Sequence, residues 1–378
     1  MAVFLTTFLL IYSSLHIYFF VKAKGAIQLN ALSAACLVIF LVIMIIAPIA
    51  VRILERSGWE NLARFMAYVG YTWMSVLFIF FALSILFDFF CLVGHTGNMA
   101  FFASLPGLSP RFVFFFTLLV SFCVNTYGYF EAQNPKIEKM TIESAAIPEK
   151  IGRIRIVQIS DVHIGIIVRG KRLKKIVDKV TETRPDILVS TGDLLDGQIN
   201  NLAESTLLLR NIRPRYGKFA ITGNHEFYAG IHESTVFTRN SGFSFLRNKG
   251  TIAAGVINII GIDDTVWNGN SFSYINAEVQ LLNRFPRENY TILLKHRPIV
   301  NSNAAGLFNI QLSGHTHKGQ IFPFSLITRI WFPHHAGHFI MTKESHLYVS
   351  RGTGTWGPPI RLLSLPEITV IDLVHKKK

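Results

Sequence analysis

The fold of the second half of the chain is decided by the stretch Arg153-Ile154-Arg155-Ile156-Val157-Gln158-Ile159-Ser160-Asp161-Val162-His163. Its apolar, β-branched first part predicts a strand. The strand leads directly into Asp161 and His163, two side chains of the kinds that bind metal ions. We therefore expect a strand whose carboxyl end carries two metal ligands.

The same arrangement recurs four more times along the chain. Apolar runs at residues 186–191, 219–222, 290–294 and 308–312 predict strands, and they lead into Gly192-Asp193, Gly223-Asn224-His225-Glu226, His296 and Gly314-His315-Thr316-His317. Open α/β sheets place their sites beyond the carboxyl ends of the strands, so we expect these side chains to meet.

The spacing within the motifs supports this expectation. Asp161 and His163 are two residues apart, so in an extended segment both side chains would project to the same face, as would those of His315 and His317. The glycines that precede the ligands allow sharp turns or close backbone approach.

The residue types predict two divalent metal ions bound side by side. Asp193 is the expected bridge between the ions, because a carboxylate has two oxygens and an imidazole or amide usually serves one metal. The first ion would also bind Asp161, His163 and His317, and the second would also bind Asn224, His296 and His315. This mixed oxygen and imidazole set predicts manganese, with iron, zinc or magnesium as alternatives, rather than calcium.

These motifs resemble those of the calcineurin-like metallophosphoesterase family, in the order D-x-H, G-D, G-N-H-[ED], H and G-H-x-H, over about residues 151–375. The resemblance implies a β-sandwich with flanking helices, the metal assignments above, and hydrolysis of phosphoric esters or anhydrides. It also implies a catalytic role for His225, which would contact the phosphoryl oxygens and the leaving group. Residues 312–320, 348–352 and 366–368 look like the membrane-associated YkuE-like branch, which usually has a second glycine where Lys318 stands.

Two arginines are candidates for binding a substrate phosphate, since a guanidinium can grip two oxygens. They are Arg351 and Arg361. The alternative is that each is an ordinary ion-pair residue.

The first third of the chain is strongly apolar and accounts for the high hydrophobic content of 50% and mean hydropathy of +0.38. Its four apolar runs, about 2–21, 31–51, 66–93 and 112–130, are each long enough for a helix across a core of about 30 Å. The start of the chain lacks the basic residues of a signal peptide, so we expect the first helix to be retained. We predict a four-helix transmembrane domain at 1–130, a linker at 131–150, and an α/β metallophosphoesterase domain at 151–378.

Charge suggests an orientation and a class of partner. Five Lys or Arg flank the helices on the side of the termini and three on the other side, which favours a cytoplasmic catalytic domain and an inner-membrane, multi-pass protein. After residue 130 the chain holds 31 basic and 20 acidic residues, a net charge of +11. Such a domain would favour anionic headgroups and phosphorylated substrates, and we expect no specific nucleic-acid partner. Asp88 is alone among acidic residues in the apolar runs, which suggests a partner or a function. The alternative is that it reaches the membrane interface from near the end of its helix.

The segment that follows the last ligand motif is apolar and aromatic from Ile321 to Phe332. It would either form a lip that dips into the membrane interface or holds acyl chains, or pack as ordinary core. His334, His335 and His338 follow it, and loop histidines of this kind need no ion.

Together these features predict a membrane-anchored phosphodiesterase or pyrophosphatase with an amphipathic or lipid-linked substrate. The resemblance suggests a lipid A precursor of the UDP-diacylglucosamine type. The alternatives are a soluble phosphorylated substrate, or a receptor or scaffold that binds metal and ligand without turnover. His225 favours catalysis, because a protein that only binds has no need of it.

Overall fold

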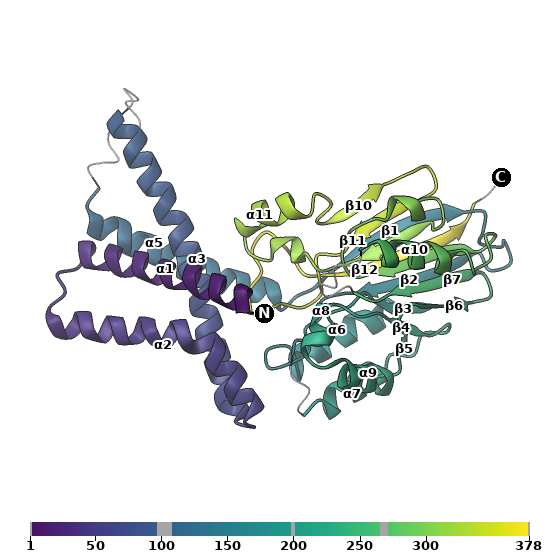
Figure 1. The fold of residues 1–378 in the computed structure, drawn as a ribbon, viewed down its shortest axis with the longest axis horizontal. Coiled ribbons are helices and arrows are strands. Elements are labelled where there is room, and N and C mark those ends of the chain that lie inside the picture. The colour runs from purple at the N-terminus through teal and green to yellow at the C-terminus, as the bar shows by residue number, and fades with distance from the viewer. Residues whose placement is uncertain (1, 97–107, 198–200, 265–270, 377–378) are drawn as a thin grey trace. The chain divides into compact units, whose positions relative to one another are not determined.

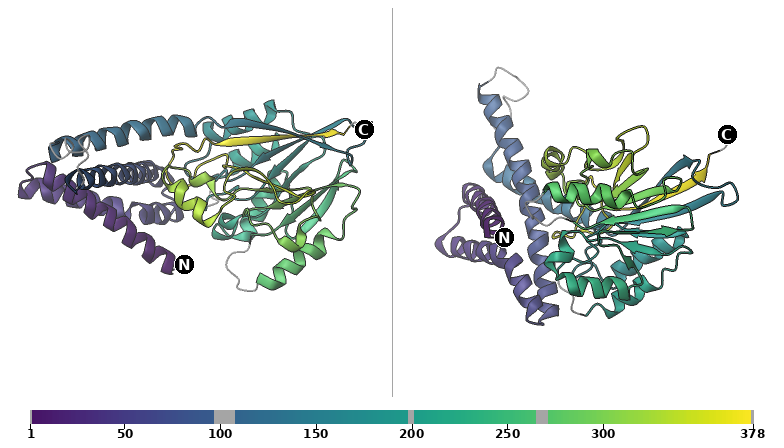
Figure 2. Two further views of the ribbon diagram at one scale, coloured as in Figure 1. Left: turned by 90° about the horizontal axis from the view of Figure 1, so that it is seen from above. Right: turned by 45° about the vertical axis from the view of Figure 1, so that its right-hand side comes forward.

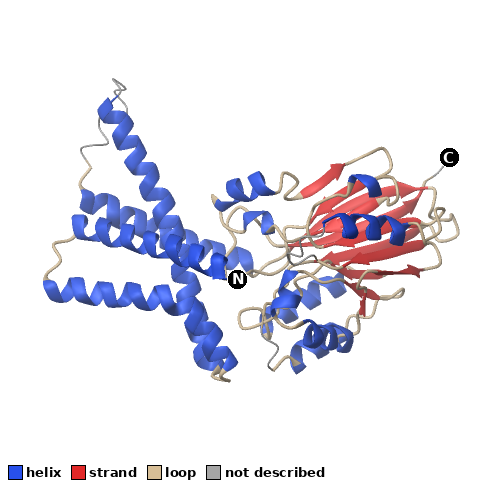
Figure 3. Cartoon of the chain, in the orientation of Figure 1, coloured by secondary structure: helices blue, strands red, loops and turns tan. Residues whose placement is uncertain are grey.

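The protein is described from a computed structural model that covers residues 2–96, 108–197, 201–264 and 271–376 (Figure 1). The chain divides into two compact units. One holds Met1–Phe130 with Gly357–Ile360, and the other holds Glu131–Trp356 with Arg361–Lys378. The first is built from helices, and the second contains the strands of the described residues (Figure 3).

The helical unit confirms the four predicted apolar helices, which are α1 (Ala2–Ala26), α2 (Ala31–Arg56), α3 (Glu60–Thr96) and α5 (Pro110–Ala132). All four are long and apolar enough to cross a membrane. Aromatic rings join three of them, because Phe19 of α1 lies 4.9 Å from the ring of Phe80 in α3 and 5.5 Å from that of Phe114 in α5.

Polar contacts join α1 to α3 within this unit. Asp88 of α3 forms an ion pair with Lys22 of α1 at 2.5 Å and accepts a hydrogen bond from the hydroxyl of Tyr18 at 2.9 Å. The acidic residue that the sequence singled out therefore ties α1 to α3. In the same pair of helices, Trp73 donates from Nε1 to Nε2 of the buried His16 at 3.0 Å.

The second unit contains two six-stranded sheets. The first has the order β1 (Lys136–Ser144), β12 (Glu367–His375), β2 (Arg153–Ile159), β3 (Ile187–Ser190), β4 (Lys218–Ala220) and β5 (Ser244–Phe245). The second has the order β10 (Gly337–Ile340), β11 (His346–Val349), β9 (Ile310–Ser313), β8 (Tyr290–Lys295), β7 (Ile257–Ile262) and β6 (Lys249–Ala253). Strands β2 to β5 are parallel, and so are β7, β8, β9 and β11. Parallel pairing brings the carboxyl ends of the central strands to one edge of each sheet.

The two sheets share one apolar core, which makes the unit a β-sandwich. Ile156 and Val189 of the first sheet belong to the same buried cluster as Ile259, Ile292 and Leu312 of the second. Each of these side chains is almost fully buried, a burial that stabilises the fold by about 1.5–3 kcal/mol per side chain.

Helices flank the sandwich (Figure 2). They are α6 (Lys171–Glu182), α7 (Ala203–Arg210), α8 (Asn224–Tyr228), α9 (Ile231–Asn240), α10 (Ser271–Leu282) and α11 (Phe324–Trp331), with the short 3-10 helices η2 (Ser302–Ala304) and η3 (His317–Gly319). Leu281 and Leu282 of α10 pack against Ile260 and Leu293 on the outer face of the second sheet. The predicted class, four apolar helices followed by an α/β metallophosphoesterase-type sandwich, is confirmed.

One strand lies where the sequence suggested a linker. Residues 136–144, within the stretch 131–150, form β1, which pairs in parallel with residues 367–375. Polar and apolar side chains alternate along β1, and its partner lies more than 200 positions away in the sequence. That pairing could not be seen locally, because a strand with one exposed face has the composition of a polar connector.

Candidate metal centre

The predicted ligands gather into one buried site. Three groups have ligand atoms within 4.8 Å of one another, namely Asp161 with His163 and His317, His163 with Asp193 and His225, and Asp193 with His296 and His315. His163 and Asp193 each belong to two groups, so the groups form one continuous centre rather than separate sites.

Each ligand follows the carboxyl end of a predicted strand. Asp161 and His163 follow β2, Asp193 follows β3, and Asn224 and His225 open α8 just after β4. His296 follows β8, while His315 and His317 follow β9. The site therefore lies beyond the carboxyl ends of the strands, where open α/β sheets usually place functional side chains.

The backbone at the ligands differs from the expected extended form. Asp161 and His163 have φ angles of 51° and 53°, and His315 and His317 have 72° and 49°. The paired side chains therefore reach the centre from left-handed turns, and not by the alternation of a strand. Non-glycine residues in this region cost on the order of 1–3 kcal/mol each, and such outliers cluster at functional sites.

Glycines make room between the loops, as expected. Gly192 has a φ of 93°, and a Cβ there would lie 2.7 Å from Nδ1 of His296. A Cβ on Gly314 would overlap the side chains of Ser160 and Asp161. A side chain at either position would push the ligand loops apart.

In the group of Asp161, His163 and His317 the atoms that could bind a metal face one another. Nε2 of His163 lies 3.0 Å from Nε2 of His317, and Nε2 of His317 lies 3.5 Å from Oδ1 of Asp161. Oδ2 of Asp193 is 3.9 Å from Nε2 of His163. Lone pairs held this close in a buried site suit a shared cation.

The second group is built in the same way. Nε2 of His296 lies 3.3 Å from Oδ2 of Asp193 and 3.2 Å from Nδ1 of His315. Oδ1 of Asn224 is buried and has no hydrogen-bond partner among the described residues. Buried polar atoms are nearly always paired, so an amide oxygen without a partner in the protein suits a metal ligand. The residues present therefore fit two divalent ions.

Neighbouring groups hold the ligands in place. Oγ of Ser160 donates to Oδ2 of Asp161 at 2.5 Å, and the backbone N–H of His315 donates to Oδ1 at 3.0 Å. Nδ1 of His296 donates to the carbonyl of Thr191 at 2.8 Å, which leaves Nε2 free for an ion. Such outer contacts fix the tautomer and the direction of a ligating imidazole.

Burial and charge set the protonation of the centre. Burial lowers the pKa of His163 to about 3, so its ring is neutral at pH 7, which is the form that binds metal. Burial also lowers the pKa of His317. For Asp193, burial favours the neutral acid, but the facing His296 and His225 outweigh it and hold the pKa well below its usual range.

His225 is held at the edge of the centre by a residue that sequence analysis did not single out. Its Nδ1 contacts the backbone carbonyl of Asp196 and lies 3.4 Å from the Oδ1 atom of that residue. Burial lowers the pKa of His225, but the charges of Asp193 and Asp196 outweigh this and raise it to about 9. The available signal was the position of Asp196, three residues after Asp193.

Glu226 is a second residue without a predicted role, although it belongs to the motif Gly223-Asn224-His225-Glu226. Its buried carboxylate accepts hydrogen bonds from the N–H groups of Gly223 at 2.6 Å, Asp193 at 2.9 Å and Leu195 at 3.1 Å. Glu226 thus joins the loop after β3 to the loop after β4.

Both arginines that the sequence offers for substrate binding have acceptors within the protein. Arg351 forms ion pairs with Glu138 at 2.5 Å and Glu367 at 2.8 Å. Arg361 is fully buried, and its guanidinium donates to the carbonyls of Gly354 and His317. In this arrangement protein acceptors occupy both guanidinium groups.

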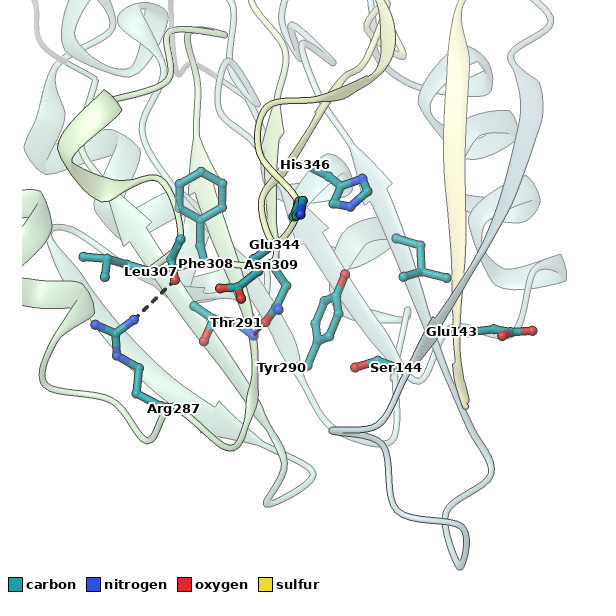
Figure 4. A pocket seen from close by; sticks show the side chains of 13 residues that line it. Glu143, Ser144, Arg287, Tyr290, Thr291, Leu307, Phe308, Asn309, Glu344 and His346 are labelled. Atoms are coloured by element: carbon teal, nitrogen blue, oxygen red, sulfur yellow. Dashed lines mark hydrogen bonds between the residues drawn. The ribbon is translucent and has the colours of Figure 1, made fainter. Parts of the chain in front are cut away.

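A cavity of about 530 Å³ lies elsewhere in the sandwich, and its lining includes none of the predicted ligands (Figure 4). It is lined by residues at the start of β8 and just before β9, such as Tyr290 and Asn309, and by the end of β1. These are the strand ends opposite to those that carry the ligands. Basic Arg287 and acidic Glu143 both line it, so its charge favours no single class of ligand.

Comparison with known proteins agrees with this geometry. Residues 154–319 match the family model of the calcineurin-like phosphoesterases. The chain is 34% identical to an uncharacterized metallophosphoesterase of Aquifex aeolicus over 68% of this chain and 99% of that protein. This chain belongs to the calcineurin-like metallophosphoesterase family.

Two further metallophosphoesterases are similar to the chain. It is 32% identical to a transmembrane protein with a metallophosphoesterase domain from Danio rerio, over 68% of this chain and 61% of that protein. It is 32% identical to the uncharacterized metallophosphoesterase YkuE of Bacillus subtilis, over 65% of this chain and 89% of that protein. The predicted family and enzyme class, a metal-dependent phosphoester hydrolase, are confirmed. Members of the family bind two divalent ions, and the apolar helices indicate a membrane protein.

Proposed function

We propose that this metallophosphoesterase hydrolyses a phosphodiester or pyrophosphate bond in an amphipathic, lipid-linked substrate at the membrane. A lipid A precursor of the UDP-diacylglucosamine type is a specific instance. The observation that carries the catalytic part is the single buried centre of facing histidines and aspartates with His225 at its edge.

In this proposal Asp193 bridges the two ions, and manganese is the expected metal. Asp161, His163 and His317 would hold the first ion, and Asn224, His296 and His315 would hold the second. When bound, a pair of divalent ions supplies positive charge to phosphoryl oxygens and a hydroxide nucleophile at neutral pH.

The proposed role of His225 follows from its surroundings. Contact with Asp196 fixes Nδ1, so Nε2 is the nitrogen available to a substrate. In the metal-free protein the charges of Asp193 and Asp196 raise the pKa of His225 to about 9. Asp196, which would bind neither ion, favours the protonated ring in the metal-loaded protein as well. His225 can then donate a proton from Nε2 to the leaving oxygen, a form of acid catalysis that contributes typically 10²–10⁴-fold.

The lipid part of the proposal is supported by the apolar residues that follow the centre in sequence. Phe322, Phe324 and Ile327 are each about half exposed and lie within ten positions of His317. Exposed apolar side chains beside a phosphoesterase site suit the acyl part of a substrate. A soluble phosphate ester would make no use of them.

The experiment is a substrate panel with the full-length protein in detergent and manganese. Nucleotide lipids, phospholipids and a water-soluble aryl phosphodiester are compared for the wild type and for H225A and D193A. We expect H225A to keep its metal and to lose about 10²–10⁴-fold in turnover, and D193A to lose both ions. H232A, which removes an exposed histidine of α9, is the matched control and should behave as the wild type.

Each part of the proposal can fail separately. Unchanged turnover in H225A would refute its catalytic role. Hydrolysis of the soluble ester alone would refute the lipid substrate, and metal and lipid binding without turnover would favour the receptor alternative.

We also propose that the catalytic domain faces the cytoplasm, since five Lys or Arg flank the helices on its side against three on the other. A fusion of alkaline phosphatase to the C-terminus should be inactive in cells. An active fusion would reverse the orientation.

A further inference from the structure

Helix α11 buries a polar residue and exposes apolar ones, whereas a helix on the surface of a soluble domain does the reverse. The residue that it buries is Thr328. Five apolar residues are exposed instead, namely Phe324, Leu326, Ile327, Ile330 and Trp331. Ile330 and Trp331 are the most exposed, at 78% each. In water this helix would expose a large apolar surface, and such surfaces mark sites that contact a protein, a ligand or a membrane.

The apolar surface continues just before the helix in sequence. Phe322, two residues before α11, is 42% exposed. We call α11 together with Phe322 the apolar lip. Helix α11 packs against η3, the turn that begins at His317, and the ring of Phe332 lies 5.3 Å from that of His315. The apolar lip therefore borders the metal centre.

The stretch of sequence that contains the apolar lip carries charge of one sign. Residues 289–343 contain no Asp or Glu, although they contain five Lys or Arg. Lys318 of η3 and Arg329 of α11 belong to this stretch. Basic residues beside exposed aromatic and aliphatic side chains are the composition of helices that lie in a membrane interface and attract anionic headgroups.

We propose that the apolar lip inserts into the headgroup and upper acyl region of the bilayer that holds the apolar helices. Three residues, 133–135, join the end of α5 to the start of β1, so the covalent chain ties this domain to its membrane helices. Tryptophan prefers the interface, and Trp331 at the end of α11 has the exposure that such a contact requires. The metal centre would then receive substrate directly from the lipid surface.

Depth measurements on the full-length protein in nanodiscs with anionic lipid test this proposal without any substrate. The environment-sensitive fluorophore NBD is attached to I330C in a background in which Cys36, Cys91 and Cys123 are replaced by alanine. The matched control is L207C on α7, where the apolar side chain is 59% exposed and no apolar lip surrounds it. We expect a blue-shifted emission from I330C that headgroup-region nitroxide lipids quench, and the emission of a probe in water from L207C.

Two results would overturn the proposal. Emission from I330C that matches L207C would place Ile330 in water. A blue-shifted signal that nitroxide lipids do not quench would mean that protein, and not lipid, covers the apolar lip. Since no turnover is measured, neither result depends on the proposed reaction.

Discussion

Replacing Arg361 by lysine distinguishes a structural role from a substrate contact. The side chain is fully buried, and its guanidinium donates to three backbone carbonyls, those of Gly354, Arg351 and His317. Nη2 also lies 2.9 Å from Nδ1 of His317, a predicted metal ligand. We expect R361K to destabilise the protein and to weaken metal binding together.

The magnitude follows from the acceptors that lysine leaves unpaired. Nη1 and Nη2 occupy separate points of a rigid fork, whereas a single ammonium nitrogen cannot reach all three carbonyls in their present positions. The loss of one or two hydrogen bonds from a charged donor, at about 1.5–3 kcal/mol each, gives a destabilisation of about 1.5–6 kcal/mol.

Thermal unfolding of the full-length protein in detergent measures the first effect, and metal analysis measures the second. Arg213 is exposed, so R213K is the matched control and should shift stability by less than about 0.5 kcal/mol. If R361K keeps its stability and its metal but raises KM, the structural role is refuted and Arg361 contacts substrate instead.

Two further perturbations probe the loops around the centre. E226A removes the acceptor for the N–H groups of Gly223, Asp193 and Leu195, so unfolding in denaturant should show a loss of about 2–4 kcal/mol; an unchanged midpoint would show that the loops hold without it. In the metal-free protein the folded pKa of His225 is raised from 6.5 to about 9. The stability from this proton is therefore present below pH 6.5 and lost as pH rises through about 9, and a midpoint that stays flat over this range would contradict the raised pKa.

Much of the sandwich could be predicted from sequence because its central strands are short apolar runs. The runs before Asp161, Asp193 and His296 became β2, β3 and β8. Buried parallel strands are apolar on both faces, so they contrast with the polar loops that follow them. Strand β1 lacked this contrast, because only one of its faces is covered and its partner β12 is remote in sequence.

The ligand set was predictable from residue type and order, but the geometry that gathers it was not. The left-handed backbone at Asp161 and His163 depends on contacts such as the hydrogen bond from the N–H of Asp161 to the carbonyl of Gly192. These contacts join loops after different strands. Asp196 contacts His225, and Arg361 contacts His317. The sequence does not show which side chain a charged residue will face after folding, so these contacts could not be predicted.

Electron paramagnetic resonance of the manganese-loaded protein tests most directly whether one centre holds two ions. We expect two Mn²⁺ per chain with a spectrum of exchange-coupled ions, which is lost in D193A because the bridging carboxylate is removed. Isolated six-line Mn²⁺ signals, or an unchanged coupled spectrum in D193A, would contradict this expectation.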